Sequence, residues 1–327
     1  MPSTLGRIFG RLHGTPPPDD PVDKSTPRDR PVPLPPGHIA VPGSLAAQGL
    51  FVIGAARTGT TILQNALNDS PDIFLFGEPC FHRDPGNADF AGRYNSKHRA
   101  WGNQETKSSY CPLLFEGDAS WQEYLAHMAT LYRYVGSKIV ITPGGARAEA
   151  EKVFAFQSRH FYRSRYVFTF RNPLDVLIST RGLAQFNGGE VASHAEVLRT
   201  FFEVIALYIR ALRNLPHVRA IFHESADDRA FAALEQAWSI ALPGAARYYD
   251  NRKVRHYTLD DVPQAHHAIV VEAIAIYDAF QQAALAGFDL LQIEQNNGHL
   301  HPDHFTVLGR LSWRVSRFLA SLDSQPA

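Results

Sequence analysis

The chain has 327 residues, of which 45 % are hydrophobic and 20 % are charged, the ordinary composition of a globular protein. Its 32 Lys and Arg residues balance its 32 Asp and Glu residues, which argues against binding to nucleic acid or to an anionic membrane by bulk charge. Two cysteines, Cys80 and Cys111, are too few for a disulfide framework and lack the spacing of a zinc or redox site, so we expect a cytoplasmic protein. We expect no transmembrane segment, because no uninterrupted apolar run approaches about 18 residues.

The first 45 residues differ in composition from the rest of the chain. Half of the 22 prolines lie between Pro2 and Pro42, and no periodic apolar pattern accompanies them. Such a segment buries too little apolar surface to offset the entropy of ordering it, so residues 14–45 are predicted to be a disordered or polyproline II-like tail. A spacer is favoured over a ligand for SH3-type domains. The short amphipathic start, Leu5–Leu12, is expected to dock on the body of the protein rather than on a membrane.

From Leu50 onward, apolar runs alternate with helical patterns, which is typical of βαβ units. The predicted strands are residues 50–53, 138–141, 166–170 and 218–222, with a further apolar run at 73–76. The predicted helices are residues 60–68, 175–183, 195–215, 229–240 and 265–285. We therefore expect an α/β fold with a doubly wound parallel sheet flanked by helices, formed by one domain over residues 46–290. The C-terminal tail, residues 291–327, is expected to carry an amphipathic basic helix at 308–319 that packs on the core or on a second subunit.

A glycine-rich turn connects the first strand to the first helix. Residues 54–61 read Gly-Ala-Ala-Arg-Thr-Gly-Thr-Thr, and the spacing of Gly54 and Gly59 matches a P-loop. Glycines, backbone N–H groups and a helix N-terminus together form a cradle for an anion. Thr60 replaces the lysine that binds the β- and γ-phosphates in nucleoside triphosphatases, and Arg57 supplies the cation instead. The turn therefore predicts a phosphate-type ligand without a γ-phosphate.

A second candidate anion site follows the strand at 166–170. Arg171 stands at the end of this strand, Pro173 suits the first turn of a helix, and Ser179 lies about two turns along that helix. The arginine fork and the serine hydroxyl could bind one phosphate. The alternative is a structural pair of Arg171 with Asp175 and a solvated serine. Because ligands of open parallel sheets bind at the carboxyl ends of strands, one ligand spanning both sites is the simpler interpretation.

These two segments together resemble the nucleotide motifs of PAPS-dependent sulfotransferases. Residues 54–61 are similar to the 5′-phosphosulfate loop of that family, and residues 170–179 are similar to its 3′-phosphate motif. The resemblance covers about residues 49–285 and is closest to the tyrosylprotein and bacterial carbohydrate-type enzymes. It implies PAPS as co-substrate, PAP as product and a hydroxyl-bearing acceptor, without a metal. The residues that it implies for nucleotide binding are Arg57, Thr58, Gly59, Thr60, Thr61, Arg171 and Ser179.

Transfer of a sulfuryl group needs a base for the acceptor hydroxyl and a cation for the departing phosphate. Arg57 and Lys138 are the candidates for stabilising the leaving group, and Glu78 is the candidate base, as the resemblance implies. Lys138 could instead be a solubilising charge on an edge strand, and Glu78 could be a plain capping or ion-pairing residue. His82 is the rival base, because the cytosolic members of the family use a histidine.

Two other functions remain open from the sequence: a P-loop kinase and a non-catalytic nucleotide-binding protein. The missing P-loop lysine argues against the kinase. The acceptor cannot be deduced, although the segments 81–124 and 184–194 are candidate acceptor loops. Their aromatic residues could stack on a sugar or phenol, or could simply pack: Tyr94, Trp101, Tyr110 and Trp121.

Overall fold

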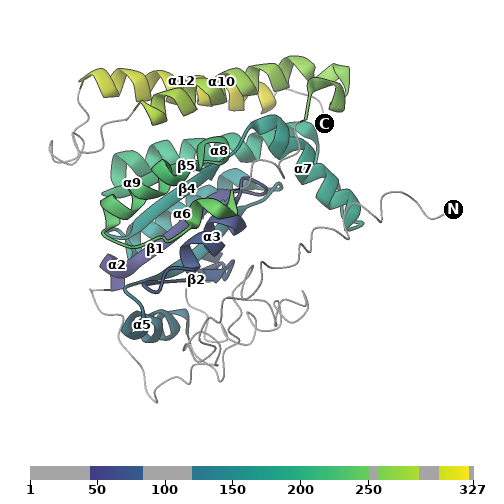
Figure 1. Ribbon diagram of the computed structural model, residues 1–327. Coiled ribbons are helices and arrows are strands. Elements are labelled where there is room, and N and C mark those ends of the chain that lie inside the picture. The colour runs from purple at the N-terminus through teal and green to yellow at the C-terminus, as the bar shows by residue number, and fades with distance from the viewer. Residues whose placement is uncertain (1–44, 84–119, 250–256, 287–301, 324–327) are drawn as a thin grey trace.

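A five-stranded, all-parallel sheet forms the centre of the protein in the computed structural model, which describes residues 45–83, 120–249, 257–286 and 302–323 (Figure 1). The strands are β1 (Gly49–Ala55), β2 (Ile73–Gly77), β3 (Tyr134–Ile141), β4 (Arg165–Phe170) and β5 (His217–Phe222), in the spatial order β2-β3-β1-β4-β5. Neighbouring strands pair in parallel, so their carboxyl ends share one edge. The predicted α/β fold with a doubly wound parallel sheet is confirmed.

The central strand β1 shows why both faces of the sheet are covered. Side chains alternate along a strand, and Phe51 and Ile53 enter the core on one face while Leu50 and Val52 enter the core on the other. All seven residues of β1 are buried. A strand buried on both faces reads as a continuous apolar run, which is why this one was recognisable in the sequence.

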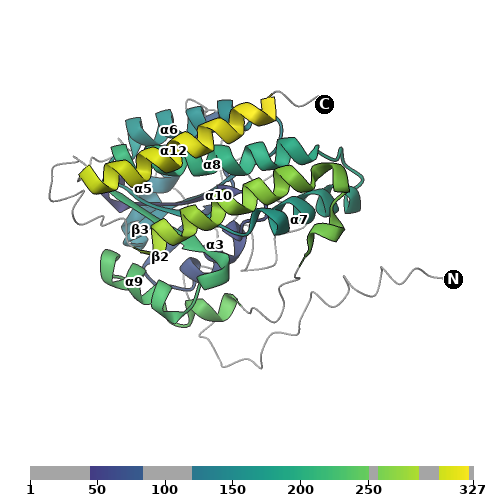
Figure 2. The same ribbon diagram turned by 90° about the horizontal axis from the view of Figure 1, so that it is seen from above.

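Helices cover the two faces unequally. The face that contains Phe51 packs against α5 (Trp121–Leu131), α6 (Ala146–His160) and α8 (His194–Asn214), and α10 (His267–Leu285) and α12 (Pro302–Asp323) form an outer layer over α8 (Figures 1 and 2). The opposite face packs against α3 (Thr60–Asn68) and α9 (Asp228–Trp238). The remaining elements are α2 (Leu45–Gln48), α7 (Pro173–Phe186) and the short 3₁₀ turns η2 (Phe81–Arg83), η3 (His223–Ser225), η4 (Ala245–Tyr248), η6 (Leu259–Asp261) and η7 (Gln264–His266).

The connections that follow β1 and its neighbour β4 run to opposite faces of the sheet. The chain leaves β1 through α3 on one face, whereas it leaves β4, the neighbour of β1, through α7 and α8 on the other face. The loops after these two adjacent strands therefore diverge. Open α/β sheets bind their ligands at such a position.

The short helix α2 and the longer helices α5 and α6 were missing from the sequence prediction. Two of the five buried residues of α6 are alanines, Ala146 and Ala150, and a third is the polar Gln157, so its apolar stripe is weak in the sequence. Helix α5 begins with a capping box formed by Ser120 and Glu123. Its first residue, Trp121, is 1 % exposed and packs against Phe81, Phe156 and Phe161, so this aromatic belongs to the core and not to an acceptor surface.

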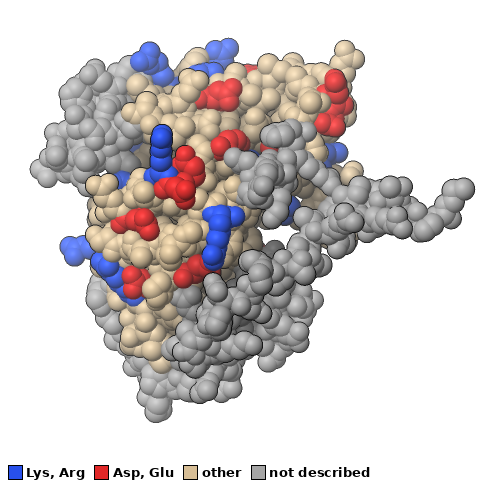
Figure 3. Space-filling model, in the orientation of Figure 1, with Lys and Arg blue, Asp and Glu red and all other residues tan. Residues whose placement is uncertain are grey.

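The C-terminal helix is longer than predicted. Helix α12 begins at Pro302, a residue suited to a first helical turn, and packs on α8 through an apolar stripe that contains Leu308, Leu311, Val315 and Phe318. Basic and acidic side chains are interspersed on the face shown in Figure 3, in line with the balanced composition. Residues 1–44 of the predicted tail 1–45 lie outside the described residues, as do Cys111, Tyr94, Trp101 and Tyr110. The last residue of that tail, Leu45, begins α2 and is buried in the core, so the tail ends before it.

One described segment, Gln264–Leu285, is long and apolar enough to span a membrane by length and composition alone. The predicted helix 265–285 falls in this segment, and Glu272 and Asp278 interrupt its apolar run. In the structure this segment includes α10, whose Val270, Ala273 and Phe280 are fully buried in the core.

Candidate nucleotide site

The loop between β1 and α3 is held tightly against β4. A Cβ on Gly54 would lie 2.4 Å from Thr169 Oγ1 and 2.6 Å from Thr58 Oγ1, so only glycine fits there. The buried Thr58 hydroxyl donates to the carbonyl of Ala55 at 2.8 Å and lies 2.8 Å from Thr169 Oγ1. The Thr58 side chain therefore supports the loop from within, and its predicted contact with the nucleotide stays a prediction.

The N-terminus of α3 presents backbone donors at the same edge. Gly59 occupies the N-cap position in the left-handed region with φ 98°, and no side chain caps the helix there. The first N–H groups of a helix have no partner within it, so the amides at Thr60 and Thr61 are suited to an anion. Arg57, with φ 70°, also adopts the left-handed conformation, which turns the chain sharply before the helix.

The second motif forms a rigid turn between β4 and α7. Pro173 is the first residue of α7, and the side chain of the N-cap residue Asn172 accepts a hydrogen bond from the Leu174 N–H at 2.9 Å. Arg171 makes two contacts with one carboxylate oxygen of Asp175, at 3.0 and 3.2 Å. The structural pair considered as an alternative is therefore present, and it holds the guanidinium at the carboxyl end of β4.

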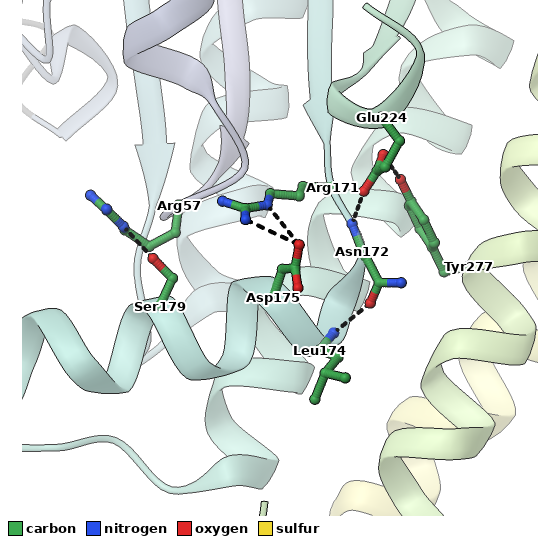
Figure 4. Close-up of polar contacts among 8 residues, drawn as sticks. All are labelled: Arg57, Arg171, Asn172, Leu174, Asp175, Ser179, Glu224 and Tyr277. Atoms are coloured by element: carbon green, nitrogen blue, oxygen red, sulfur yellow. Dashed lines mark hydrogen bonds and ion pairs between the residues drawn. The ribbon is translucent and has the colours of Figure 1, made fainter. Parts of the chain in front are cut away.

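Ser179 is half-buried and contacts the first motif directly. Arg57 Nε donates to Ser179 Oγ at 3.0 Å, although the two residues are 122 positions apart in the chain (Figure 4). Figure 4 also shows Arg171 lying between this pair and Asn172. The structure thus brings the glycine-rich turn and the second motif together, as the sequence predicted.

Lys138 occupies the interior and not an edge. It lies within β3, between β2 and β1, and its side chain is 0 % exposed, so the solubilising role is wrong. The predicted strand 138–141 is longer in the structure, where β3 begins at Tyr134. The buried ammonium contacts Glu78 Oε1 at 2.9 Å and donates to Thr61 Oγ1 at 2.8 Å. A buried charge requires such partners. Lys138 therefore connects the candidate base with the N-terminus of α3.

The rival base His82 contacts a different carboxylate. Its Nε2 lies 2.6 Å from Glu149 Oε1 on α6, and Arg83 Nε donates to the same oxygen at 2.6 Å. Burial lowers the pKa of His82 despite the nearby carboxylate. Burial alone would raise the pKa of Glu149, but the hydrogen bonds from His82 and Arg83 outweigh it and lower that pKa.

Two residues of this edge were missed by sequence reasoning, His223 and Glu224, which directly follow β5. His223 is 7 % exposed, and its buried Nδ1 has no hydrogen-bond partner among the described residues. This nitrogen lies 3.2 Å from where a Cβ on Gly59 would stand. Burial, followed by the charge of Arg171, lowers the pKa of His223 to about 4. The signal was available, because the carboxyl end of every strand borders the same edge.

These observations fit a nucleotide that carries phosphate groups at two positions. The uncapped helix, the glycine turn and the two arginines offer donors along one edge, and the buried Nδ1 of His223, which has no partner among the described residues, borders it. Within the described ranges, no group of three or more His, Cys, Asp or Glu residues is arranged to hold a metal ion.

Comparison with known proteins identifies the family. A model of the sulfotransferase family matches residues 49–227, which include both motifs. No curated protein sequence matches the chain significantly.

Several solved structures are similar in fold at low identity. The sulfotransferase domain of the olefin synthase of Synechococcus PCC 7002 is 13 % identical, with a TM-score of 0.44 over 89 % of this chain and 100 % of that one. A sulfotransferase of Mycobacterium avium is 12 % identical, with a TM-score of 0.42 over 71 % and 76 %. A sulfotransferase of Alicyclobacillus acidocaldarius is 17 % identical, with a TM-score of 0.39 over 69 % and 93 %.

Because the family match extends over more than half of the chain and includes both phosphate motifs, the chain belongs to the sulfotransferase family of transferases, and this membership implies PAPS as its co-substrate.

Proposed function

We propose that this chain transfers the sulfuryl group of PAPS to a hydroxyl group of an acceptor by in-line displacement. The observation that carries the proposal is the hydrogen bond between Arg57 and Ser179, which joins the two phosphate motifs into one site. A ligand with phosphate groups at both the 5′ and 3′ positions of one adenosine matches two neighbouring anion sites better than a triphosphate does.

The binding residues have distinct tasks in this proposal. The uncapped N-terminus of α3, with Gly59, Thr60 and Thr61, receives the 5′-phosphosulfate end, and Thr58 supports the loop. Arg171 and Ser179 receive the 3′-phosphate. The Arg57 side chain, bound to Ser179 in this structure, has the reach of a long, flexible chain and neutralises charge on the departing 5′-phosphate.

Glu78 and Lys138 are arranged for the chemical step. Glu78 keeps 23 % of its side chain exposed, so an acceptor hydroxyl can reach the carboxylate, whereas Lys138 is fully buried behind it. As the acceptor oxygen bonds to sulfur, its proton passes to Glu78, and the bond from sulfur to the 5′-phosphate oxygen breaks with its electron pair on PAP. The Lys138 ammonium stabilises that oxygen from a low-dielectric position, where a charge acts more strongly than in water.

The acceptor is proposed only as a class of hydroxyl compounds: a carbohydrate, a tyrosyl peptide or a small molecule. Incubation with radiolabelled PAPS and a panel of sugars, tyrosyl peptides, lipids and phenols would identify the best acceptor. Most of the candidate acceptor segment 81–124 lies outside the described residues, so its chemistry must come from this assay.

With that acceptor, the Glu78→Gln variant tests the base. The amide still accepts a hydrogen bond from Lys138 but cannot take a proton, so turnover is expected to fall by about 10²- to 10⁴-fold. Calorimetry should show a nearly unchanged affinity for PAP. The matched control is Glu149→Gln, which removes the carboxylate beside His82 instead. If Glu149→Gln lost turnover and Glu78→Gln kept it, the base would be His82 and the assignment of Glu78 would be wrong.

A further inference from the structure

A carboxylate outside both phosphate motifs fixes the turn that carries Arg171. Glu224, on η3 directly after β5, accepts a hydrogen bond from the backbone N–H of Asn172 through Oε1. Its other oxygen, Oε2, accepts from the hydroxyl of Tyr277 at 2.8 Å. Figure 4 shows Glu224 bridging the turn and Tyr277. One side chain thus joins the β4–α7 turn to helix α10.

The side chain of Tyr277 is buried and holds this carboxylate in a fixed position. It is 1 % exposed, and its ring packs near Phe201 and Phe222 in the main core. Burial, and then the Glu224 charge, raise the pKa of Tyr277 well above its ordinary value of 10, so the hydroxyl stays protonated and donates. Hydrogen bonds to a charged acceptor are stronger than those between neutral groups.

The position of the turn decides where the Arg171 guanidinium points. Asn172, whose N–H is held by Glu224, follows Arg171 directly and is the N-cap of α7. The same helix carries Asp175, which orients Arg171, and Ser179. A small displacement of the backbone at this turn would weaken the binding of a phosphate, because a bidentate contact tolerates only a narrow range of distances and angles.

We propose that Glu224 and Tyr277 are positioning residues of the donor site, which hold the Arg171–Asn172 turn in the geometry that distinguishes a nucleotide with a 3′-phosphate from one without it. This inference rests on the proposed function, because it assigns the 3′-phosphate to Arg171 and Ser179. It also gives α10 a role in donor selection, although α10 lies beyond the residues that match the family.

The test compares PAP with AMP, which is the same nucleotide without the 3′-phosphate. Isothermal titration calorimetry measures both dissociation constants for the wild-type chain, for Tyr277→Phe and for Glu224→Gln. Tyr277→Phe keeps the ring and removes the donor, and Glu224→Gln leaves one acceptor oxygen for two donors. Each variant is expected to lower the affinity for PAP by about 5- to 20-fold and the affinity for AMP by less than about twofold.

The control is Tyr166→Phe, which removes another buried hydroxyl, one that donates to the Phe161 carbonyl at 2.6 Å near the start of β4. It should lower the melting temperature about as much as Tyr277→Phe does and leave the ratio of PAP to AMP affinity unchanged. If Tyr277→Phe and Glu224→Gln also kept the wild-type ratio, the positioning role would be refuted while the proposed function stood. A wild-type chain that did not bind PAP would refute the proposed function itself.

Discussion

At the residue scale, two ionisable side chains near the candidate site, Lys138 and His223, are buried. The ammonium of Lys138 is excluded from water and depends on Glu78 and Thr61 for its partners. Breaking such a buried pair is strongly destabilising, because one charge then lacks compensation. The same contacts that stabilise the fold therefore hold the proposed base beside the α3 N-terminus.

His223 makes the stability of the protein depend on pH. A histidine whose pKa is lower in the folded state takes up its proton on unfolding, so acid below the ordinary pKa of 6.5 favours the unfolded chain. Its stabilising contribution is complete above pH 6.5 and is lost as the pH falls towards about 4. At about 1.4 kcal/mol per pH unit, the loss amounts to about 3 kcal/mol.

Urea unfolding of the wild-type chain and of His223→Gln, at pH values from 8 to 4, checks this dependence. The wild-type free energy of unfolding should fall more steeply below pH 6.5 than that of the variant. His194 and His82, whose pKa values are also lowered by burial, affect both proteins equally and cancel in the difference. Parallel curves for the two proteins would contradict the burial of a neutral His223.

At the scale of elements, the turn from β1 to α3 has little room for an added side-chain atom. Gly54→Ala would drive a methyl group into Thr169 and Thr58, so the loop must shift and the α3 N-terminus with it. Such overpacking costs about 1–3 kcal/mol, and PAP affinity should fall by at least about tenfold. Thermal melting and calorimetry measure the two effects.

Gly182→Ala is the matched control for that substitution. Gly182 lies inside α7, and nothing stands within 4 Å of a Cβ built there. Alanine is preferred over glycine in a helix by about 0.5–1 kcal/mol, so this variant should be slightly stabilised and should bind PAP normally. If Gly54→Ala behaved like Gly182→Ala, the close packing of the loop would not be needed for binding.

The elements themselves differ in how well their sequences predict them. The predicted helix 60–68 matches α3, because a glycine turn and a clear apolar face mark it. Helix α6 was missed because its five buried residues include two alanines and a glutamine, which weaken its apolar stripe. Within the site, Arg57, Arg171 and Ser179 could be found from motifs, whereas Glu224 and Tyr277 could not be paired, since the contact joins a turn to a helix 53 positions away.

For the whole molecule, the core extends to the C-terminal helix. Phe318 on α12 is fully buried and lies 4.4 Å from the Phe202 ring of α8, measured between centroids. Helix α12 also lies beside α10, which holds Tyr277. The outer helices α10 and α12 therefore pack into the same aromatic core, and α10 also contacts the candidate nucleotide site through Tyr277.

Phe318→Ala should therefore lower the free energy of unfolding by about 3–5 kcal/mol, the usual cost of a large cavity in a core. Trp313→Ala, on the same helix, provides the control, because Trp313 is 60 % exposed and its removal should change stability by less than about 1 kcal/mol. Denaturant unfolding distinguishes the two. Equal small effects would show that α12 does not belong to the cooperative core.

Calorimetric titration of the wild-type chain and of Arg171→Ala with PAP, and of the wild-type chain with ATP and magnesium, tests the proposed nucleotide site. We expect that the wild-type chain binds PAP, that Arg171→Ala binds it at least about tenfold more weakly, and that ATP with magnesium gives no comparable heat. No heat with PAP, together with a clear response to ATP and magnesium, would contradict the claim that the two motifs bind one bisphosphorylated adenosine.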